Sequence, residues 1–443
     1  MKKCIIVLAV ALLLAALPVV VSADVPAPEG PFNTAFRVQN LGSEPAHCSF
    51  IFYDANGHEA YSSGPLPEIP VGESAYVYVP TDTTVADGQY AGVVSCDQEV
   101  AAVVNFSDPD SGASYSGVSE SEVADTLYAP GIYDNYYNYY SNVIVQNASG
   151  ELNDITLEIY EPGNPTPVYT DTKSNVPANG FVTWEQEGLT ELADNQFYSA
   201  KIIGTGDIAA IVNIYGKGPC DDQLYSYNPF ARGSTIAYAP VIMNDYYGYN
   251  TALVIQNLGT IDADVTITYS DGTVKTTTIA PGAADSRYTP AEGLATGLLT
   301  GAKVECTNGQ PIVVLVNESN DKNRAASYSG FAAGSTTVRA PIVMRRYYKY
   351  NTSVTCQNIG TAAATMSISY GGIPGTTTSD PVPVNGIWMF YQPTDPLLSD
   401  GFIGSATITS TQPIVCIVNE DMNEPPERDQ IMDMLYAYNG IGQ

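Results

Sequence analysis

The sequence is poor in charge, in histidine and in aromatic side chains other than tyrosine. Only 14% of its 443 residues are charged, against about a quarter in an average soluble domain, and 47 acidic side chains outnumber 17 basic ones. There are two His, two Trp and 11 Phe, but 32 Tyr. A formal net charge of −30 repels phosphate backbones, so nucleic-acid binding is not expected. The 44% hydrophobic content is too high for a disordered chain.

Motifs for catalysis are also missing. The sequence has no His-Glu-x-x-His, no Gly-x-Ser-x-Gly and no glycine-rich phosphate loop. Both histidines, His47 and His58, fall in the first quarter of the chain, where solvated strand or turn positions are the simplest interpretation. A pair of carboxylates in a cleft could still hydrolyse glycosides, but the repetition described below argues against a single active cleft. We therefore expect a protein that is not an enzyme.

The first 23 residues have the pattern of a secretory signal peptide. Lys2 and Lys3 precede an apolar run that ends at Val21, and Val21-Ser22-Ala23 matches the small-residue cleavage pattern. An uncleaved anchor helix is the alternative, but it lacks a stop-transfer flank. No later run approaches the ~18 apolar residues that a membrane span needs. The sequence thus predicts a mature chain from Asp24 that is secreted or at the cell surface, without a transmembrane segment.

Four markers recur along the chain and define an internal repeat. The first three occur four times each, and Ala-Pro stands 17 residues before the last Asn of the first marker in three units. The markers are Gln39-Asn40, Gln146-Asn147, Gln256-Asn257 and Gln357-Asn358; Val104-Asn105, Val212-Asn213, Val316-Asn317 and Val418-Asn419; Tyr115-Ser116-Gly117, Tyr227-Asn228, Tyr328-Ser329-Gly330 and Tyr438-Asn439-Gly440; and Ala129-Pro130, Ala239-Pro240 and Ala340-Pro341.

The repeat divides the mature chain into four units with a period near that of one sandwich domain. Unit 1 spans residues 24–124, unit 2 spans 125–234, unit 3 spans 235–336 and unit 4 spans 337–443. A period of roughly 105 residues is too long for a solenoid repeat but suits an independent two-sheet domain of about 100 residues. The chain is therefore expected to be a tandem array of four Ig-like antiparallel β-sandwiches after a signal peptide.

Unit 3 illustrates the expected strands. Period-two alternation and turn dipeptides mark segments that are typical of half-buried strands, and none has helical apolar spacing. Asp271-Gly272 and Asn308-Gly309 are both tight-hairpin signals, so each is expected to join two paired strands. The segments are Thr251–Gln256, Asp264–Tyr269, Val274–Ile279, Lys303–Cys306, Ile312–Val316 and Ala326–Ser329.

The order Asn-x-Gly, a Thr/Val strand, Asp-Gly, then a Pro-Gly turn before an aromatic strand resembles a known class of domains. It is similar to the Ig-like repeats of bacterial and archaeal secreted proteins, of which the CARDB-type adhesion-related modules are the nearest by pattern. The Tyr-Tyr-x-Tyr-Asn-Thr lead and the Val-Asn-Glu segment also resemble uncharacterised repeats of large bacterial surface proteins. The resemblance covers nearly all of the mature chain. It implies a cell-surface or extracellular scaffold and carries over no catalytic residue.

A tyrosine-rich lead precedes the Gln-Asn strand in units 2, 3 and 4 and is the most distinctive segment. One interpretation is an aromatic platform that binds sugar rings or a protein partner. The other is packing at the junction with the preceding unit. Unit 1 lacks this lead, because Ala27-Pro28 stands only 12 residues before Asn40. The candidate binding residues are Tyr136, Tyr137, Tyr139, Tyr246, Tyr247, Tyr249, Tyr347, Tyr348 and Tyr350.

Acidic loops follow each Val-Asn marker and are the candidate metal sites. Oxygen-rich loops at sandwich ends can hold Ca²⁺, which prefers six to eight oxygen ligands, although none matches EF-hand spacing and solvated loop tips are the alternative. No other cofactor is expected. The candidate ligands are Asp108, Asp110, Asp221, Asp222, Glu318, Asp321, Glu420 and Asp421.

Six cysteines remain after the predicted processing, an even number in an exported chain. Cys48 and Cys96 share unit 1, and Cys356 and Cys416 share unit 4. We expect a disulfide within each pair, spanning the sandwich core as the B–F bridge does in immunoglobulin domains. Cys220 and Cys306 lie in different units and are expected to be thiols. Aromatic residues after the central turn of each unit are expected in the core. They are Tyr76, Tyr78, Trp184, Tyr288 and Trp388.

The sequence therefore predicts an exported structural or adhesive repeat protein. Its partner would be a cell-surface or matrix protein, or a polysaccharide. One alternative is a carbohydrate-binding array that uses the tyrosine leads. Another is a head-to-tail filament subunit, in which the short opening of unit 1 accepts the stub Ile441-Gly442-Gln443 by strand addition.

Overall fold

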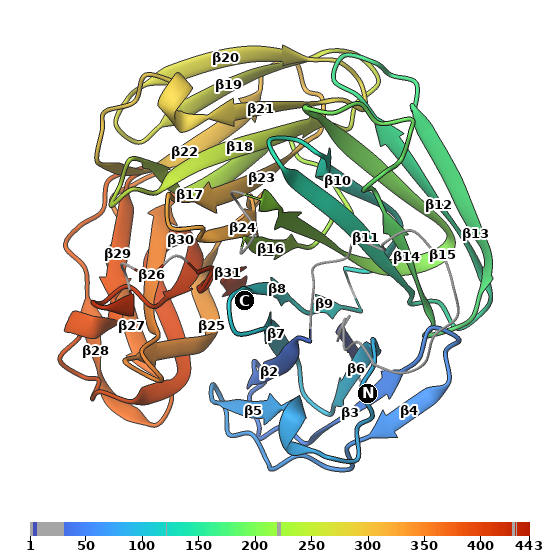
Figure 1. The fold of residues 1–443 in the computed structure, drawn as a ribbon. Helices are drawn as coiled ribbons and strands as arrows, with labels where there is room; N and C mark the ends of the chain where they lie inside the picture. The colour runs from blue at the N-terminus through green and yellow to red at the C-terminus, as the bar shows by residue number, and fades with distance from the viewer. Residues whose placement is uncertain (1–2, 7–30, 121, 219–222, 428–429, 431) are drawn as a thin grey trace.

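Alternating apolar and polar side chains form antiparallel strands along the whole chain. The computed structural model describes all residues except 1–2, 7–30, 121, 219–222, 428–429 and 431. Its secondary structure is β throughout, apart from short 3₁₀ turns such as η1 (Val79–Thr81), η3 (Thr289–Ala291) and η4 (Gln392–Thr394). The predicted all-β sandwich class is confirmed (Figure 1).

Unit 3 shows the basic sandwich. One sheet has the order β17-β22-β19-β20 and the other has the order β21-β18-β23-β24. Side chains from both sheets, among them Val265, Ile267, Val304 and Val316, are fully buried between them. The strands are β17 (Ile236–Asn244), β18 (Asn250–Asn257), β19 (Ala263–Tyr269), β20 (Val274–Ile279), β21 (Ala284–Tyr288), β22 (Leu298–Cys306), β23 (Ile312–Ser319) and β24 (Ala325–Ser329).

The expected hairpin around Asn308-Gly309 is wrong. β22 and β23, which flank it, lie in different sheets and do not pair with each other. In units 2 and 4 the same stretch is one continuous strand, β15 (Gln196–Gly216) or β30 (Phe402–Asp421), whose first half pairs in one sheet and whose second half pairs in the other. The Asn-Gly dipeptide therefore marks a crossing between sheets, because its neighbours find their partners in earlier strands.

The other units repeat this arrangement. Unit 1 contains β2 (Asn33–Asn40), β3 (Cys48–Tyr53), β4 (Glu59–Ser62), β5 (Ser74–Tyr78), β6 (Ala91–Cys96), β7 (Val100–Ser107), β8 (Gly112–Ser116) and β9 (Val118–Ser119). A further strand, β1 (Lys3–Ile6), belongs to the predicted signal peptide and pairs with β6. Unit 2 contains β10 (Ala124–Asp134), β11 (Tyr139–Asn147), β12 (Asn153–Tyr160), β13 (Tyr169–Val176), β14 (Phe181–Glu185), β15 and β16 (Leu224–Tyr227). Unit 4 contains β25 (Ser335–Arg345), β26 (Asn351–Asn358), β27 (Met366–Tyr370), β28 (Ile373–Thr378), β29 (Ile387–Tyr391), β30, β31 (Leu435–Asn439) and β32 (Ile441–Gly442).

The Ala-Pro marker makes a bulge in the opening strand of units 2, 3 and 4. Pairing of β10, β17 and β25 shifts register immediately after the alanine, where a proline, which has no N–H, is tolerated. A tyrosine from the last core strand holds the bulge: the Tyr227 hydroxyl donates to Gly131 O at 2.8 Å and accepts from Gly131 N. Tyr328 makes the same two bonds to Val241. The Ala-Pro marker and the tyrosine of the third marker therefore act together, because the tyrosine hydroxyl satisfies the backbone groups of the bulge.

The four units close into a ring, which the repeat pattern did not predict. β8, β16, β24 and β31 lie at its centre, and each contacts the corresponding strand of both neighbouring units (Figure 1). Unit 1 therefore contacts unit 4 as well as unit 2. The Gln443 side chain, at the end of unit 4, donates to Leu41 O in unit 1 at 2.6 Å. The array is a closed ring rather than a rod or a string.

Candidate functional site

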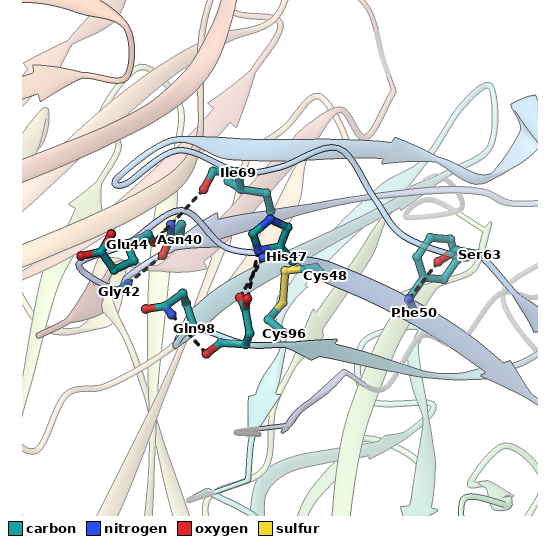
Figure 2. Close-up of a disulfide and its surroundings, with 11 residues drawn as sticks. Asn40, Gly42, Glu44, His47, Cys48, Phe50, Ser63, Ile69, Cys96 and Gln98 are labelled. Atoms are coloured by element: carbon teal, nitrogen blue, oxygen red, sulfur yellow. Dashed lines mark hydrogen bonds and ion pairs between the residues drawn. A yellow bond between two sulfur atoms is a disulfide. The ribbon is translucent and has the colours of Figure 1, made fainter.

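The asparagine of each Gln-Asn marker holds its own unit together. The Asn40 amide donates to Glu44 O at 2.7 Å and to Ile69 O at 2.9 Å, and its oxygen accepts from Gly42 N (Figure 2). Asn147, Asn257 and Asn358 make the same three kinds of bond in their units. All four are fully buried. This asparagine is a structural residue.

The glutamine of the same marker also reaches a neighbouring unit. The Gln256 amide donates to Gly282 O in its own unit and, at 3.4 Å, to Ala200 O of unit 2. Gln357 repeats this toward Ala302 of unit 3. Gln39 of unit 1 donates to Ala406 O of unit 4 at 3.4 Å. Gln146 of unit 2 donates to Asn179 O in its own unit. The glutamine contact that joins unit 2 to unit 3 and unit 3 to unit 4 therefore also joins unit 4 to unit 1 and closes the ring.

The Val-Asn asparagines of units 1, 3 and 4 bond across the seams between units, whereas Asn213 bonds within unit 2. The Asn105 amide of unit 1 donates to Glu420 of unit 4 at 3.0 Å, and the Asn419 amide of unit 4 donates to Glu318 of unit 3 at 2.6 Å. Both carboxyl groups are 1% exposed. Burial raises the pKa of Glu318 and of Glu420 to about 8. Both are therefore mainly protonated at neutral pH, which makes their burial tolerable.

Small and large side chains alternate around the ring axis. The second residues of β8, β16, β24 and β31 are Ala113, Tyr225, Ala326 and Tyr436. Gly112 precedes Ala113, and a methyl group there would come within 2.3 Å of the Tyr436 hydroxyl oxygen. The odd-numbered units thus leave the space that the even-numbered units fill.

The third marker follows the same alternation. The Asn228 amide of unit 2 donates to Ser116 O of unit 1, and Asn228 Oδ1 accepts from Ser116 N. Asn439 of unit 4 makes the same pair of bonds with Ser329 of unit 3. The marker therefore alternates between Tyr-Ser and Tyr-Asn because each asparagine of an even-numbered unit makes a pair of hydrogen bonds to the serine of the preceding odd-numbered unit.

Asp433 joins all four units near the axis. Its carboxylate accepts from the backbone N–H groups of Leu224 in unit 2, Ala325 in unit 3 and Leu435 in its own unit, at 2.8, 2.9 and 3.3 Å. Its own N–H donates to Asp110 O of unit 1. The side chain is fully buried, and burial raises its pKa well above the ordinary value. No sequence pattern points to this residue, because it lies outside the repeated markers.

The tyrosine leads form tight hairpins in which the three tyrosines have different roles. The outer two face each other, as in Tyr246 and Tyr249, and the middle residue has a positive φ. The third tyrosine of each lead packs inward: Tyr249 donates to Asp421 of unit 4 at 2.9 Å, and the Tyr350 ring lies 5.7 Å from that of Tyr436. In unit 2, Tyr139 donates to Gln223. The first tyrosines, Tyr136, Tyr246 and Tyr347, are partly buried.

Where the leads of units 2 and 3 touch another unit, it is the following one. Tyr249 of unit 3 contacts unit 4, and Tyr133, which stacks on Tyr136 in unit 2, accepts from Asn317 of unit 3. Junction packing, one of the two alternatives for the leads, is therefore seen for Tyr249, with the following unit rather than the preceding one. The reason is geometric: the opening strand of units 2, 3 and 4 lies on the side of the sandwich that faces the next unit in the ring, as the contacts of β17 with β26 and β30 show.

The middle tyrosine of each lead remains exposed. Tyr137, Tyr247 and Tyr348 are 67%, 83% and 79% exposed, and each ring contacts the preceding tyrosine edge-to-face at 4.8 Å. A left-handed backbone costs a residue other than glycine about 1–2 kcal/mol. The four-unit ring thus presents an exposed tyrosine at the same hairpin tip in units 2, 3 and 4.

Unit 1 contributes a different aromatic surface. Tyr76 and Tyr78 on β5 are 47% and 38% exposed, with ring centroids 6.5 Å apart and planes within 6°. Burial raises the pKa of Tyr76, and the nearby Tyr347 and Tyr348 of unit 4 raise it further. The expectation that Tyr76, Tyr78 and Tyr288 are core residues is wrong, since their strands turn these positions outward. Trp184 is buried as expected, and Trp388 is partly buried against the core of unit 4. We call Tyr76, Tyr78 and Tyr348 the seam patch.

The acidic candidates do not converge. Asp108 Oδ1 accepts from Asp110 N and Ser111 N in a local turn, and Asp321 lies in an exposed loop. Asp421 pairs with the buried guanidinium of Arg324. Among the residues that the structure describes, no three His, Cys, Asp or Glu side chains are placed to hold a metal ion. Asp221 and Asp222 lie outside the described residues, so calcium binding stays a prediction for those positions.

Both predicted disulfides are confirmed, but their geometry differs from the expectation. Cys48–Cys96 joins β3 to β6 (Figure 2). Cys356–Cys416 joins β26 to β30, and the two Cα–Cα distances are 4.2 and 4.0 Å. Each bridge links directly paired residues of neighbouring strands in one sheet, and neither crosses the core. Cys306 is a buried thiol, and Cys220 lies outside the described residues.

Comparisons with known proteins find only weak similarity. No family model matches the chain, and no curated protein matches it. A solved structure described as "Crystal Structure of Thermotoga maritima 1070" is 21% identical, covering 22% of this chain and 94% of its own, with a TM-score of 0.20. A tetra-tandem repeat from the extending region of a large adhesion protein is 12% identical, covering 90% and 93%, with a TM-score of 0.12. Likenesses this weak carry no argument.

The structure also bears on membrane association. Within the described part of the chain, no helix is long and apolar enough to cross a membrane.

The two histidines lie on the surface: His47 contacts Asp97 at 2.9 Å and Glu68 at 3.4 Å, and His58 contacts Asp54 at 3.4 Å.

Proposed function

We propose that the chain is an exported, non-enzymatic structural or adhesive protein that acts as a closed ring of four sandwiches. One observation carries this proposal. The asparagines repeated in every unit hold the units together and three of the four repeated glutamines bond across seams, whereas the tyrosines at the hairpin tips of units 2, 3 and 4 are repeated and remain exposed. A binding role at a cell surface or matrix then belongs to those tips, which a rigid ring holds in fixed positions.

Secretion of the full-length chain from a bacterial host tests the export step. The proposal expects the protein outside the cytoplasm, with an intact mass that corresponds to residues 24–443. Retention in the cell at the uncut mass would contradict it.

A panel of hydrolase substrates tests the non-enzymatic assignment, and robust turnover would overturn it.

Surface binding tests the adhesive role. Plates coated with matrix protein or with cell-wall polysaccharide should retain the processed chain. The triple variant Y137A/Y247A/Y348A should lose most of this retention. V274A changes an apolar side chain that is 55% exposed on a different hairpin and is the matched control. Equal retention of all three proteins would contradict a role for the tips.

The seam patch favours carbohydrate binding as a second candidate function. Parallel, half-exposed rings on one strand give flat apolar faces next to hydroxyl groups, which suits the faces of pyranose rings. Immobilised polysaccharides should retain the wild type and Y76F/Y78F, which keeps the flat faces, but not Y76A/Y78A. If Y76A/Y78A binds as well as Y76F/Y78F and the wild type, this patch is not the sugar site.

A further inference from the structure

Unit 1 differs from the other units at the edge strand of one sheet. In units 2, 3 and 4 this edge is filled by β10, β17 or β25, which pairs with β15, β22 or β30 and then turns through the tyrosine hairpin into the next strand. In unit 1 the same edge, along β6, carries Lys3–Ile6. Residues 7–30, between β1 and the first core strand, lie outside the described residues.

The edge of β6 will lose this partner if the chain is processed as proposed above. Lys3–Ile6 belong to the predicted signal peptide, and cleavage after Ala23 removes them. The N–H and C=O groups of Gly92–Ser95 that face β1 would then have no strand beside them. An open strand edge is a template for pairing with another strand. This step rests on the export proposal.

The mature N-terminus keeps the sequence that fills this edge in the other units. Val25-Pro26-Ala27-Pro28 matches the pattern apolar-x-Ala-Pro of Leu127–Pro130, Ala237–Pro240 and Val338–Pro341. In the sequence, Pro26 aligns with Tyr128 and Tyr238. The N–H groups of those residues donate to Phe230 and Phe331, away from the strand equivalent to β6. A proline at this position therefore costs no hydrogen bond with β6.

The connection that follows the motif is too short to repeat the arrangement of units 2, 3 and 4. Ala27-Pro28 stands 12 residues before Asn40 instead of 17, and the missing five residues correspond to the tyrosine hairpin. In the other units that hairpin returns the chain from the edge strand to the adjacent core strand. Shortening a hinge of this kind favours exchange of the strand between two copies of a chain.

We propose that residues 24–28 of one processed chain fill the β6 edge of unit 1 in a second copy, and the reverse, which gives a reciprocal strand-swapped dimer. By equivalence with β25 and β30, where Arg339 pairs with Thr407, Pro26 of one copy lies opposite Val93 of the other. The contact is symmetric and closes on itself. The acceptor edge lies on the side of unit 1 that faces unit 2.

This places self-association at the N-terminal end alone. The stub expected to act as the donor in a head-to-tail filament is already paired inside unit 4: Ile441 and Gly442 lie opposite Arg339 and Val338, and Gln443 N donates to Thr337 O. A filament built through that stub would require breaking these contacts.

Light scattering coupled to size exclusion tests the dimer on the secreted, processed chain, with its N-terminus verified by intact mass. The expected molar mass is twice that of the monomer. Two variants should be monomeric: one without residues 24–29, and one in which an inserted copy of the five residues 245–249, which carry the tyrosine hairpin of unit 3, restores the 17-residue spacing. A monomer from the correctly cleaved wild type at high micromolar concentration would overturn the swap and leave the export proposal intact, whereas an uncleaved chain would contradict export itself.

Cysteine mixing identifies the chain that donates the strand. P26C and V93C are made as separate chains in a Cys220→Ser background, mixed and oxidised. A disulfide-linked dimer that needs both variants supports the swap. If the single chain P26C/V93C instead cross-links within itself and the mixture yields no covalent dimer, the segment folds back on its own unit, and the proposal is wrong. Absence of any cross-link would also overturn it.

Discussion

At the scale of single residues, the four Gln-Asn asparagines carry the clearest structural role. Each is a buried amide that donates twice and accepts once inside its own unit. Each buried donor or acceptor that is left without a hydrogen-bond partner lowers the free energy of unfolding by about 1–3 kcal/mol. The sequence marks these positions by repetition, but repetition alone does not separate a structural residue from a binding residue; the depth of burial does.

Replacement of Asn257 by Ala should lower the free energy of unfolding by roughly 2–4 kcal/mol, because two backbone carbonyls and one N–H lose their partner. Urea unfolding monitored by tryptophan and tyrosine fluorescence measures this. The same substitution at Asn358 should cost a similar amount, since its bonds are equivalent. A loss in one unit with no effect in the other would contradict a shared structural role.

Gly112 is the residue on which packing at the ring axis depends. A methyl group there would meet the Tyr436 ring and hydroxyl, and both residues are buried. G112A should therefore destabilise the protein by about 1–3 kcal/mol, the usual cost of overpacking. G150A is the control, because a methyl group at Gly150 meets no atom within 4 Å. Thermal unfolding measures both, and equal stability of the two variants would argue against tight contact at the axis.

At the scale of strands, the disulfides show what the sequence could and could not predict. The pairing of Cys48 with Cys96 follows from their shared unit and strand pattern. That the bridge joins neighbouring strands does not, because it depends on which strand lies beside β6, and the chain crosses to the other sheet after β6 as it does between β22 and β23 in unit 3. Local turn signals fix where a strand ends, but the choice of partner depends on the whole sandwich.

The same register predicts a third disulfide. Cys306 lies opposite Val265 in unit 3, as Cys96 lies opposite Cys48 in unit 1. V265C should therefore oxidise with Cys306 without rearrangement, and a loop of this length should add about 2–4 kcal/mol of stability. Intact mass under native oxidation and thermal unfolding with and without reductant measure this. V265A controls for the lost side chain, and a V265C chain that keeps both thiols would contradict the register.

At the scale of the whole molecule, closure of the ring is what the sequence did not predict. A tandem repeat fixes the order of its units, and order alone fits a rod, a string or a ring equally well. The seam contacts distinguish these forms. Gln39 of unit 1 reaches Ala406 of unit 4 by the bond through which Gln357 reaches Ala302 between consecutive units. That equivalence appears only when the first and last units are seen side by side.

The buried seam carboxyls make stability depend on pH. The pKa of Glu318 and Glu420 rises from the ordinary 4.5 to about 8, chiefly through burial. The folded state then binds more protons than the unfolded state between these values, so stability is fully present below about pH 4.5 and falls as pH rises through about 8. The melting temperature should be lower at pH 8.5 than at pH 5.5.

The double variant E318Q/E420Q isolates this effect from the general charge of the chain. Neutral amides retain the acceptor oxygens for Asn419 and Asn105 but cannot ionise. The difference in melting temperature between pH 5.5 and pH 8.5 should therefore shrink in the variant. An unchanged difference would place the pH dependence in other groups.

Small-angle scattering on the processed chain without residues 24–29, which is expected to be monomeric, tests the closed ring most directly. A compact body of about 420 residues should have a radius of gyration of about 22 Å. Four sandwiches placed end to end would give roughly 40 Å, because each is about 35 Å across. The closed ring predicts a value near the lower figure and a single maximum in the distance distribution. A value near the higher figure, with a long tail, would contradict it.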